Sequence, residues 1–228
     1  MKRLLIIMVA LMLFGLSMSA KMQELKLDPE DIFSDREVFI YGLFDNESGE
    51  EITETEVICE VEDGYLLIDD SVNESFVSVK LDDLSPYSGE KSIHYAGDYV
   101  IHSQFTETQI IIDAETPDGE QHIELDRPEG LLLHNDQLLF SLRAMDFSIE
   151  KQKLKLFIPA NASIIDMAVM VEGIEKFNAP AGEFEVYRVT LDFGLSMQTA
   201  FYEVENPHKM IAYDNGTLQY RLKESKSE

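Results

Sequence analysis

The chain has 228 residues, of which 44 are acidic and 18 are lysine or arginine, so its formal net charge is −26. A field of that sign repels nucleic-acid backbones and anionic lipid headgroups, which argues against nucleic-acid binding. The length suits a single large domain, and the lone cysteine excludes an intramolecular disulfide.

The first twenty residues have the features of a cleavable secretory signal. Lys2 and Arg3 precede an apolar run over residues 4–16, which is too short to span a bilayer comfortably. Ser17, Ser19 and Ala20 then supply small residues, so cleavage is expected after Ser19 or Ala20. We therefore expect a periplasmic or secreted domain over residues 21–228, with no stable membrane span after cleavage. Retention of residues 1–20 as an anchor is the alternative.

After this segment, apolar and polar residues alternate with a period of two. Leu154, Leu156 and Ile158, for example, are separated by Lys155 and Phe157, and this spacing is typical of half-buried antiparallel strands. In chain order the pattern predicts strands at residues 37–44, 52–61, 64–68, 75–81, 91–95, 99–105, 107–113, 121–125, 153–158, 165–171, 183–193, 197–204, 208–213 and 218–222.

Turn residues separate these strands. Pro180-Ala181-Gly182 predicts a tight turn, and Asn215-Gly216 is the strongest hairpin signal in the chain. Within 183–193 the apolar positions change phase, which predicts either a β-bulge or a strand that crosses between two environments.

One segment departs from the period of two. Leu138, Leu139, Leu142 and Met145 follow helical spacing, with Asn135 or Asp136 as the expected N-cap. The predicted fold is therefore mainly β: a strongly curved antiparallel sheet, either a half-barrel or a distorted barrel, with one central α-helix near 135–146.

The common catalytic motifs are missing from the sequence. Cys59 alternates with Val57 and Val61 and has Glu56 and Glu60 beside it, which favours a buried small hydrophobe over a nucleophile. We expect no catalytic residue and no cofactor, and the chain is predicted not to be an enzyme.

The histidines offer only a weak metal hypothesis. His94 and His102 would face each other if the turn between their strands used residues 97–99, but no third ligand can be named. Solvated surface histidines are the simpler interpretation. The acidic segment 113–120 lacks the spacing of a calcium loop and is interpreted as a hairpin tip, so no metal site is predicted.

Aromatic and apolar residues gather at alternating positions of the last strands. Their ordinary role would be core packing, and the sharper hypothesis is a concave face that holds a hydrophobic ligand. The candidate residues of this apolar face are Tyr187, Val189, Leu191, Phe193, Phe201 and Tyr220.

Four segments carry a family resemblance. The principal one is 171–189, which contains Val171, Gly173, Glu175, the Pro180-Ala181-Gly182 turn, Phe184, Tyr187 and Val189. It is similar to the signature of domain of unknown function 3108, a family of uncharacterised bacterial envelope proteins. The segments 81–88, 134–144 and 200–210 resemble other elements of that family in the same order. The resemblance implies a periplasmic or secreted β-rich domain, like the half-barrels that carry lipoproteins, and it implies no activity.

Three functions follow as hypotheses. The first is a non-enzymatic binding domain that holds a hydrophobic, lipid-like ligand or a segment of a partner on the curved sheet. The second is an envelope assembly protein that acts through protein contacts at edge strands or at its acidic surface. The third is a metal-dependent hydrolase, supported only by the His94 and His102 pair. The sequence leaves the ligand, the partner and the oligomeric state open.

Overall fold

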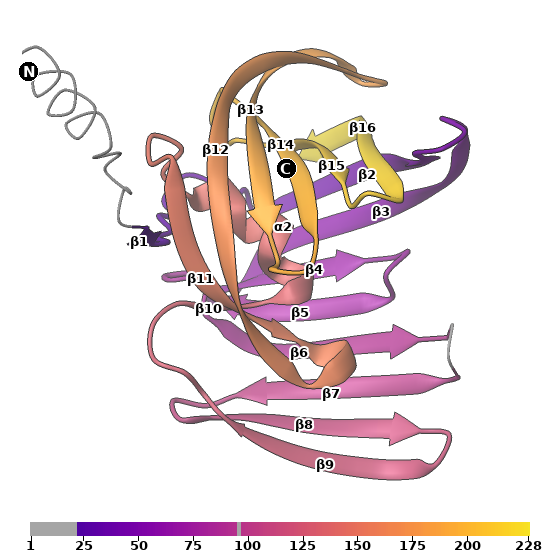
Figure 1. Ribbon diagram of the computed structural model, residues 1–228, viewed down its shortest axis with the longest axis vertical. Helices are drawn as coiled ribbons and strands as arrows, with labels where there is room; N and C mark the ends of the chain where they lie inside the picture. Colours follow the sequence, from indigo (N-terminus) through magenta and orange to yellow (C-terminus); the bar gives the residue numbers. More distant parts are fainter. Residues whose placement is uncertain (1–21, 95–96) are drawn as a thin grey trace, which may run out of the picture.

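The computed structural model describes residues 22–94 and 97–228, and the predicted signal segment 1–20 lies outside these ranges (Figure 1). The first half of the chain is a run of antiparallel strands. Their bounds are β1 (Gln23–Glu24), β2 (Arg36–Asp45), β3 (Glu51–Glu62), β4 (Tyr65–Asp70), β5 (Ser75–Lys80), β6 (Pro86–Ile93), β7 (Tyr99–Phe105), β8 (Gln109–Thr116) and β9 (Gly119–Asp126).

The second half contains the helical segment and the remaining strands. Their bounds are β10 (Leu132–His134), η1 (Asn135–Gln137), α2 (Leu138–Ser141), η2 (Leu142–Ala144), β11 (Lys151–Ile158), η3 (Pro159–Asn161), β12 (Ser163–Ala179), β13 (Gly182–Asp192), β14 (Met197–Glu203), β15 (Met210–Asp214) and β16 (Leu218–Ser227).

All the strands belong to one strongly curved sheet. Its order is β1-β11-β12-β13-β14-β15-β16-β2-β3-β4-β5-β6-β7-β8-β9, with β10 paired beside β11. The chain thus forms two meanders, β2 to β9 and β11 to β16, which are joined where β16 pairs with β2. The strands of the described residues do not close into a barrel. The predicted fold class is confirmed, with the correction that β1 and β10 each pair in parallel with β11.

The helical segment lies inside the curve of the sheet (Figure 1). Its position agrees with the predicted helix near 135–146, but two 3-10 turns flank a single α-helical turn. The N-cap is His134, not Asn135 or Asp136: Asp136 N donates to His134 Nδ1 at 3.2 Å, and His134 N donates to Gln137 Oε1 at 3.1 Å. This reciprocal capping box satisfies two backbone donors at the helix start. No helix in the described part of the chain is long and apolar enough to cross a bilayer.

Two hydrophobic cores result from this arrangement. The main core joins the helical segment to the inner faces of both meanders, and residues such as Tyr41, Leu66 and Leu156 are completely buried there. A smaller core forms where β10 and β11 cross over β7 and β8, and it includes Ile112 and Phe157. The end of the sheet at β10 and β11 therefore packs across the end at β7 and β8 without pairing with it in the described residues.

Most of the predicted turns are present. Pro180 and Ala181 connect β12 to β13, with Ala179 paired to Gly182. β15 and β16 form the predicted hairpin, in which residues 215–217 connect the strands and Asn215 N donates to Leu218 O at 3.1 Å.

Of the two alternatives for 183–193, the strand that crosses between two environments describes β13, and the β-bulge lies in the neighbouring strand. The register of β12 shifts between Val171 and Gly173, opposite Val189 and Arg188. Beyond the bulge the β12–β13 hairpin curls over β16, where Ala181 N donates to Leu222 O at 3.0 Å. The curl accounts for the change of phase: Val186 and Val189 are both fully buried although they point to opposite faces of β13.

Candidate functional site

The predicted apolar face is built mainly into the main core. Val189 and Leu191 are completely buried, and the half-buried Tyr187 stacks on Phe147 at a ring distance of 4.5 Å.

Cross-strand partners share a face of an antiparallel sheet, so Phe201, which pairs with Arg188, points away from Tyr187 and Val189. Tyr187, Val189, Leu191 and Phe193 lie on one face of the sheet. Tyr220 lies on the same face, because Val189 pairs with Ala200, Ala200 with Tyr213, and Tyr213 with Tyr220.

Helical residues cover this inner side. Tyr202, the cross-strand partner of Tyr187, donates from its hydroxyl to Leu139 O at 2.8 Å. Side chains of the sheet and of the helix therefore already occupy the space that a ligand on the inner face would need. Binding of a ligand by the six residues stays a prediction.

An open groove remains at one end of the strands, and we call it the end groove. It lies where the β13–β14 turn, the β15–β16 turn, η3 and the start of η1 meet. Its outer hollow measures about 590 Å³ and its inner hollow about 170 Å³. Asn135, Phe193, Tyr213 and Asn215 border both hollows. Phe193 and Tyr220 are thus the two predicted face residues that line the end groove, and Tyr220 lies along its inner hollow.

The charges of the inner hollow are compensated locally. Lys91 Nζ lies 2.8 Å from Asp136 Oδ1, and both side chains are largely buried. Asp70 Oδ1 accepts hydrogen bonds from Thr55 Oγ1 and from the backbone of Val72 and Asn73, while Asp70 Oδ2 accepts from Asn73 Nδ2 at 2.7 Å. Burial raises the pKa of both Tyr213 and Tyr220, so their phenols stay protonated at neutral pH. The groove therefore presents neutral aromatic and amide groups.

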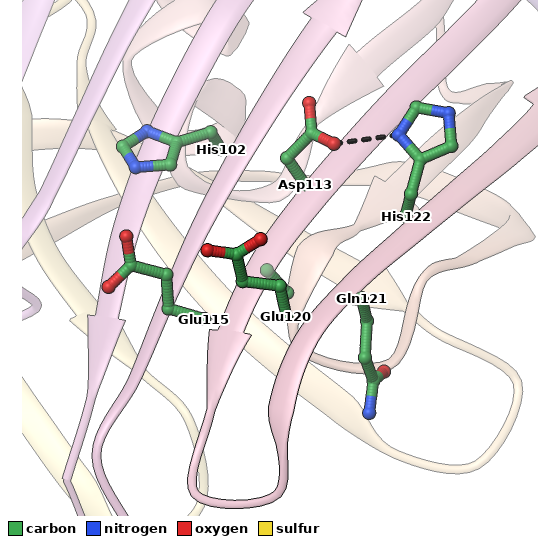
Figure 2. A pocket seen from close by; sticks show the side chains of 7 residues that line it. His102, Asp113, Glu115, Glu120, Gln121 and His122 are labelled. Carbon is green, nitrogen blue, oxygen red and sulfur yellow. Dashed lines mark hydrogen bonds and ion pairs between the residues drawn. The ribbon is translucent and has the colours of Figure 1, made fainter.

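A second candidate lies on the outer face of the far meander. The register places Glu90, His102, Asp113 and His122 in one row across β6 to β9, which we call the histidine–carboxylate row. His122 Nδ1 lies 2.7 Å from Asp113 Oδ1, and His102 Nδ1 lies 3.3 Å from Glu90 Oε2. Hydrogen bonding to Asp113 raises the pKa of His122. Figure 2 shows His102, Asp113 and His122 on neighbouring strands, with Glu115 and Glu120 on the same side.

β9 forms an open edge of the sheet beside this row. Among the described residues it pairs only with β8. Arg127 N donates to Thr108 O at 2.8 Å, so these two residues form a hydrogen-bonded pair. Along an antiparallel ladder, hydrogen-bonded pairs alternate with pairs that make no hydrogen bond. By this alternation Gln121, Ile123 and Leu125 bond to β8. The N–H and C=O groups of the intervening residues point to the open edge. These residues are Glu120, His122, Glu124 and Asp126.

The geometry that would have brought His94 and His102 together is not found. His94 bonds instead to Glu74 Oε2 at 2.8 Å and to Asp98 Oδ1 at 2.9 Å, and the partner of His102 on β6 is Glu90. The register that sets these neighbours cannot be read from the sequence. Within residues 22–94 and 97–228, no group of three or more histidine, cysteine or acidic side chains is arranged to hold a metal ion.

Two further predicted features have structural roles. Cys59 is buried in the main core, as predicted from its alternation with Val57, and burial raises the pKa of its thiol to about 12. The acidic segment 113–120 forms the end of the β8–β9 hairpin, where Thr116 pairs with Gly119, in agreement with the interpretation as a hairpin tip.

Neither a protein-family model nor a curated protein matches the chain. The resemblance to domain of unknown function 3108 thus stays a prediction. Among solved structures, a β-barrel-like protein of domain of unknown function DUF1849 from Brucella abortus is similar at 10% identity and a TM-score of 0.49, covering 84% of this chain and 97% of that one. A putative lipoprotein from Parabacteroides distasonis is similar at 14% identity and a TM-score of 0.32, covering 90% of this chain and 100% of that one.

Proposed function

We propose that the chain is an extracytoplasmic, non-enzymatic binding domain that takes up an extended segment of a partner protein along β9. One observation carries the proposal: among residues 22–94 and 97–228, β9 is left with an unpaired edge at the end of a sheet whose opposite end is covered by β1 and β10. An exposed edge is a template for strand addition, in which main-chain hydrogen bonds supply affinity.

The side chains around the edge specify the chemistry of the partner. On the outer face, Glu120, Glu124 and Asp126 are exposed, and Asp113 and Glu115 stand beside them on β8. On the inner face, Ile123 and Leu125 are half-buried at the margin of the smaller core. A strand that alternates lysine or arginine with apolar residues would place its cations opposite the carboxylates. Its apolar side chains would extend the smaller core.

The same charges oppose pairing of β9 with a second copy of itself. In an antiparallel β9–β9 pair, Glu120, Glu124 and Asp126 of both copies would line one face, and like charges on neighbouring strands are destabilising. Charged edge residues are a common protection against aggregation. The occupant favoured by this edge is therefore a basic heterologous segment.

The test uses a synthetic peptide of about eight residues that alternates lysine and valine, titrated into the domain and followed by amide hydrogen exchange. We expect protection at Glu120, His122, Glu124 and Asp126, a Kd on the order of 100 µM, and weaker binding at high salt.

The variant Glu124→Pro removes an amide that points outward, so β9 keeps its ladder with β8 while strand addition is blocked. The matched control Glu115→Lys reduces the negative charge of the same face, one strand away from the edge. The proposal requires Glu124→Pro to abolish binding and Glu115→Lys to weaken it only modestly. Binding that survives Glu124→Pro, or equal binding of a peptide with glutamate in place of lysine, would overturn it.

Export is part of the proposal and has its own test. Fractionation of cells that express the full chain should recover the protein outside the cytoplasm. N-terminal sequencing should show a new terminus after Ser19 or Ala20. A cytoplasmic protein that retains Met1 would contradict this part of the proposal.

The hydrophobic-ligand hypothesis has one supporting observation. Leu195 is fully exposed and Met197 is 64% exposed at the β13–β14 turn, next to Phe193. A lipid on the inner face would have to displace the helical segment that contacts Tyr202. Native mass spectrometry of protein purified from its own compartment tests this: a bound mass in the lipid range supports the hypothesis, and an apo mass removes it.

A further inference from the structure

We propose that the end groove is a binding site for a neutral saccharide, independent of the open edge of β9. The two places are built from different elements, since η1, η3, β11, β12, β14, β15 and the β13–β14 and β15–β16 turns line the outer hollow and β9 contributes nothing to it. The outer hollow, at about 590 Å³, lies within the range of about 300–1,000 Å³ that is usual for small-ligand sites.

The charge balance of the groove favours an uncharged ligand. Lys91 is the only lysine or arginine along either hollow, and its ammonium is already engaged by Asp136. An anionic ligand would also meet the field of a chain with net charge −26. A cation would find Asp70 surrounded by four hydrogen-bond donors and Asp136 neutralised by Lys91.

The polar groups that remain are those that hydroxyl groups match well. Asn135 Oδ1, Asn215 Nδ2 and Gln198 Nε2 make no hydrogen bond to any described residue, although the rest of each amide is engaged. Three residues that line the groove thus keep one amide oxygen and two amide NH2 groups without a hydrogen bond to the described residues. A sugar hydroxyl both donates and accepts, so a single ligand can satisfy both kinds of group.

Aromatic and aliphatic side chains supply the other half of the site. Phe193 and Tyr213 border both hollows, and Ile158 and Ile165 line the outer one. A pyranose ring has an apolar C–H face and a rim of hydroxyls. Stacking of that face on Phe193 or Tyr213 would direct the rim toward the amides of Asn135, Gln198 and Asn215. A purely lipid-like chain would leave these amides without partners, which costs free energy when water is displaced.

The experiment titrates maltohexaose, cellohexaose and chitohexaose separately into the domain over residues 21–228 and records amide chemical shifts. We expect at least one of them to shift signals of residues 193–198 and 213–217, with a Kd on the order of 1 mM or tighter. Phe193→Ala should weaken that binding about tenfold, through loss of ring stacking, and Phe193→Tyr should restore it.

Phe184→Ala is the matched control, because Phe184 lies on the same β13 hairpin and packs against the main core, away from the groove. It should lower stability without changing the Kd, and Glu124→Pro on β9 should also leave the Kd unchanged. No shift with any of the three saccharides, shifts located elsewhere, or equal weakening by Phe184→Ala would overturn the proposal. Shifts of the groove residues by palmitate alone would also overturn it.

Discussion

Arg143 and Glu37 form a completely buried, two-contact ion pair between the helical segment and the sheet. Arg143 Nη1 lies 2.8 Å from Glu37 Oε2, Arg143 Nη2 lies 3.0 Å from Glu37 Oε1, and neither side chain is exposed to solvent. The guanidinium also donates to Ile32 O at 3.1 Å and to Pro207 O at 3.3 Å. One side chain thus connects η2 to β2 and to the loop before β15, so it fixes the helix inside the curve.

Replacement of this arginine should be severely destabilising. Arg143→Met leaves the Glu37 carboxylate buried without a partner, and we expect the free energy of unfolding to fall by about 3–5 kcal/mol. Urea denaturation measures the loss. The double variant Arg143→Met/Glu37→Leu removes both charges and should recover most of the stability. A single variant that unfolds at the same urea concentration as the parent would contradict the structural role of the pair.

His134 should make the stability depend on pH. Burial between Phe105 and Phe157 lowers its pKa from 6.5 to about 4, with Asp136 opposing and Lys91 reinforcing the shift. Because the folded pKa is the lower one, the neutral ring stabilises the fold above pH 6.5. This contribution decreases as the pH falls from 6.5 to about 4, by up to about 3 kcal/mol.

The variant His134→Asn isolates this effect, because asparagine can still cap η1 but does not titrate. The difference in unfolding free energy between the parent and the variant should decrease as the pH falls from 7 to about 4. His94 and His122 have raised pKa values, so their contributions have the opposite sign, and their exposure keeps them small. A difference that is constant with pH would show that His134 is solvated.

Cys59 should be unreactive in the folded protein. Its side chain is buried in the main core and the pKa of the thiol is raised to about 12, so almost no thiolate is present at neutral pH. A thiol reagent at neutral pH should label the native chain only at the rate of unfolding, and should label one thiol per chain at once in denaturant. Rapid labelling of the native protein would place Cys59 outside the core.

Gly89 should not tolerate a side chain. A Cβ atom at this position of β6 would lie 2.7 Å from His134 Nε2 and 2.9 Å from Ser103 Oγ. Both neighbours are buried, so Gly89→Ala should cost about 1–3 kcal/mol through overpacking. Ser88→Ala on the same strand serves as the control, and thermal unfolding compares the two. If the Gly89→Ala variant were as stable as the parent, the close approach of β6 and His134 would be wrong.

The period of two located most of the long strands, because their alternating residues face a core on one side only. It missed β1 and β10, which have two and three residues and pair in parallel with β11. The start of β6 was placed at residue 91 instead of Pro86, because Pro86 and Gly89 weaken a strand pattern and Gly89 is present for close packing on His134.

The candidate sites were less predictable, because they depend on register and curvature. Phe193 reaches the end groove while Val189 and Leu191 are covered, although the three belong to one alternating pattern. The histidine–carboxylate row joins residues of four strands through cross-strand pairing. The position of His102 in one row with Glu90, Asp113 and His122 depends on the lengths of the β6–β7, β7–β8 and β8–β9 connections, which set the register.

The junction of β16 with β2 gives the chain a particular order of assembly. β16 lies in the middle of the sheet, and among the described residues its pairing with β2 is the one strand pairing between the two meanders. Until β16 is synthesised and pairs, the partly formed sheet has unpaired edges at β2 and β15. Contacts between residues so distant in sequence form slowly, because the intervening chain must first be ordered. The two meanders can therefore join into one sheet only after residues 218–227 have been synthesised.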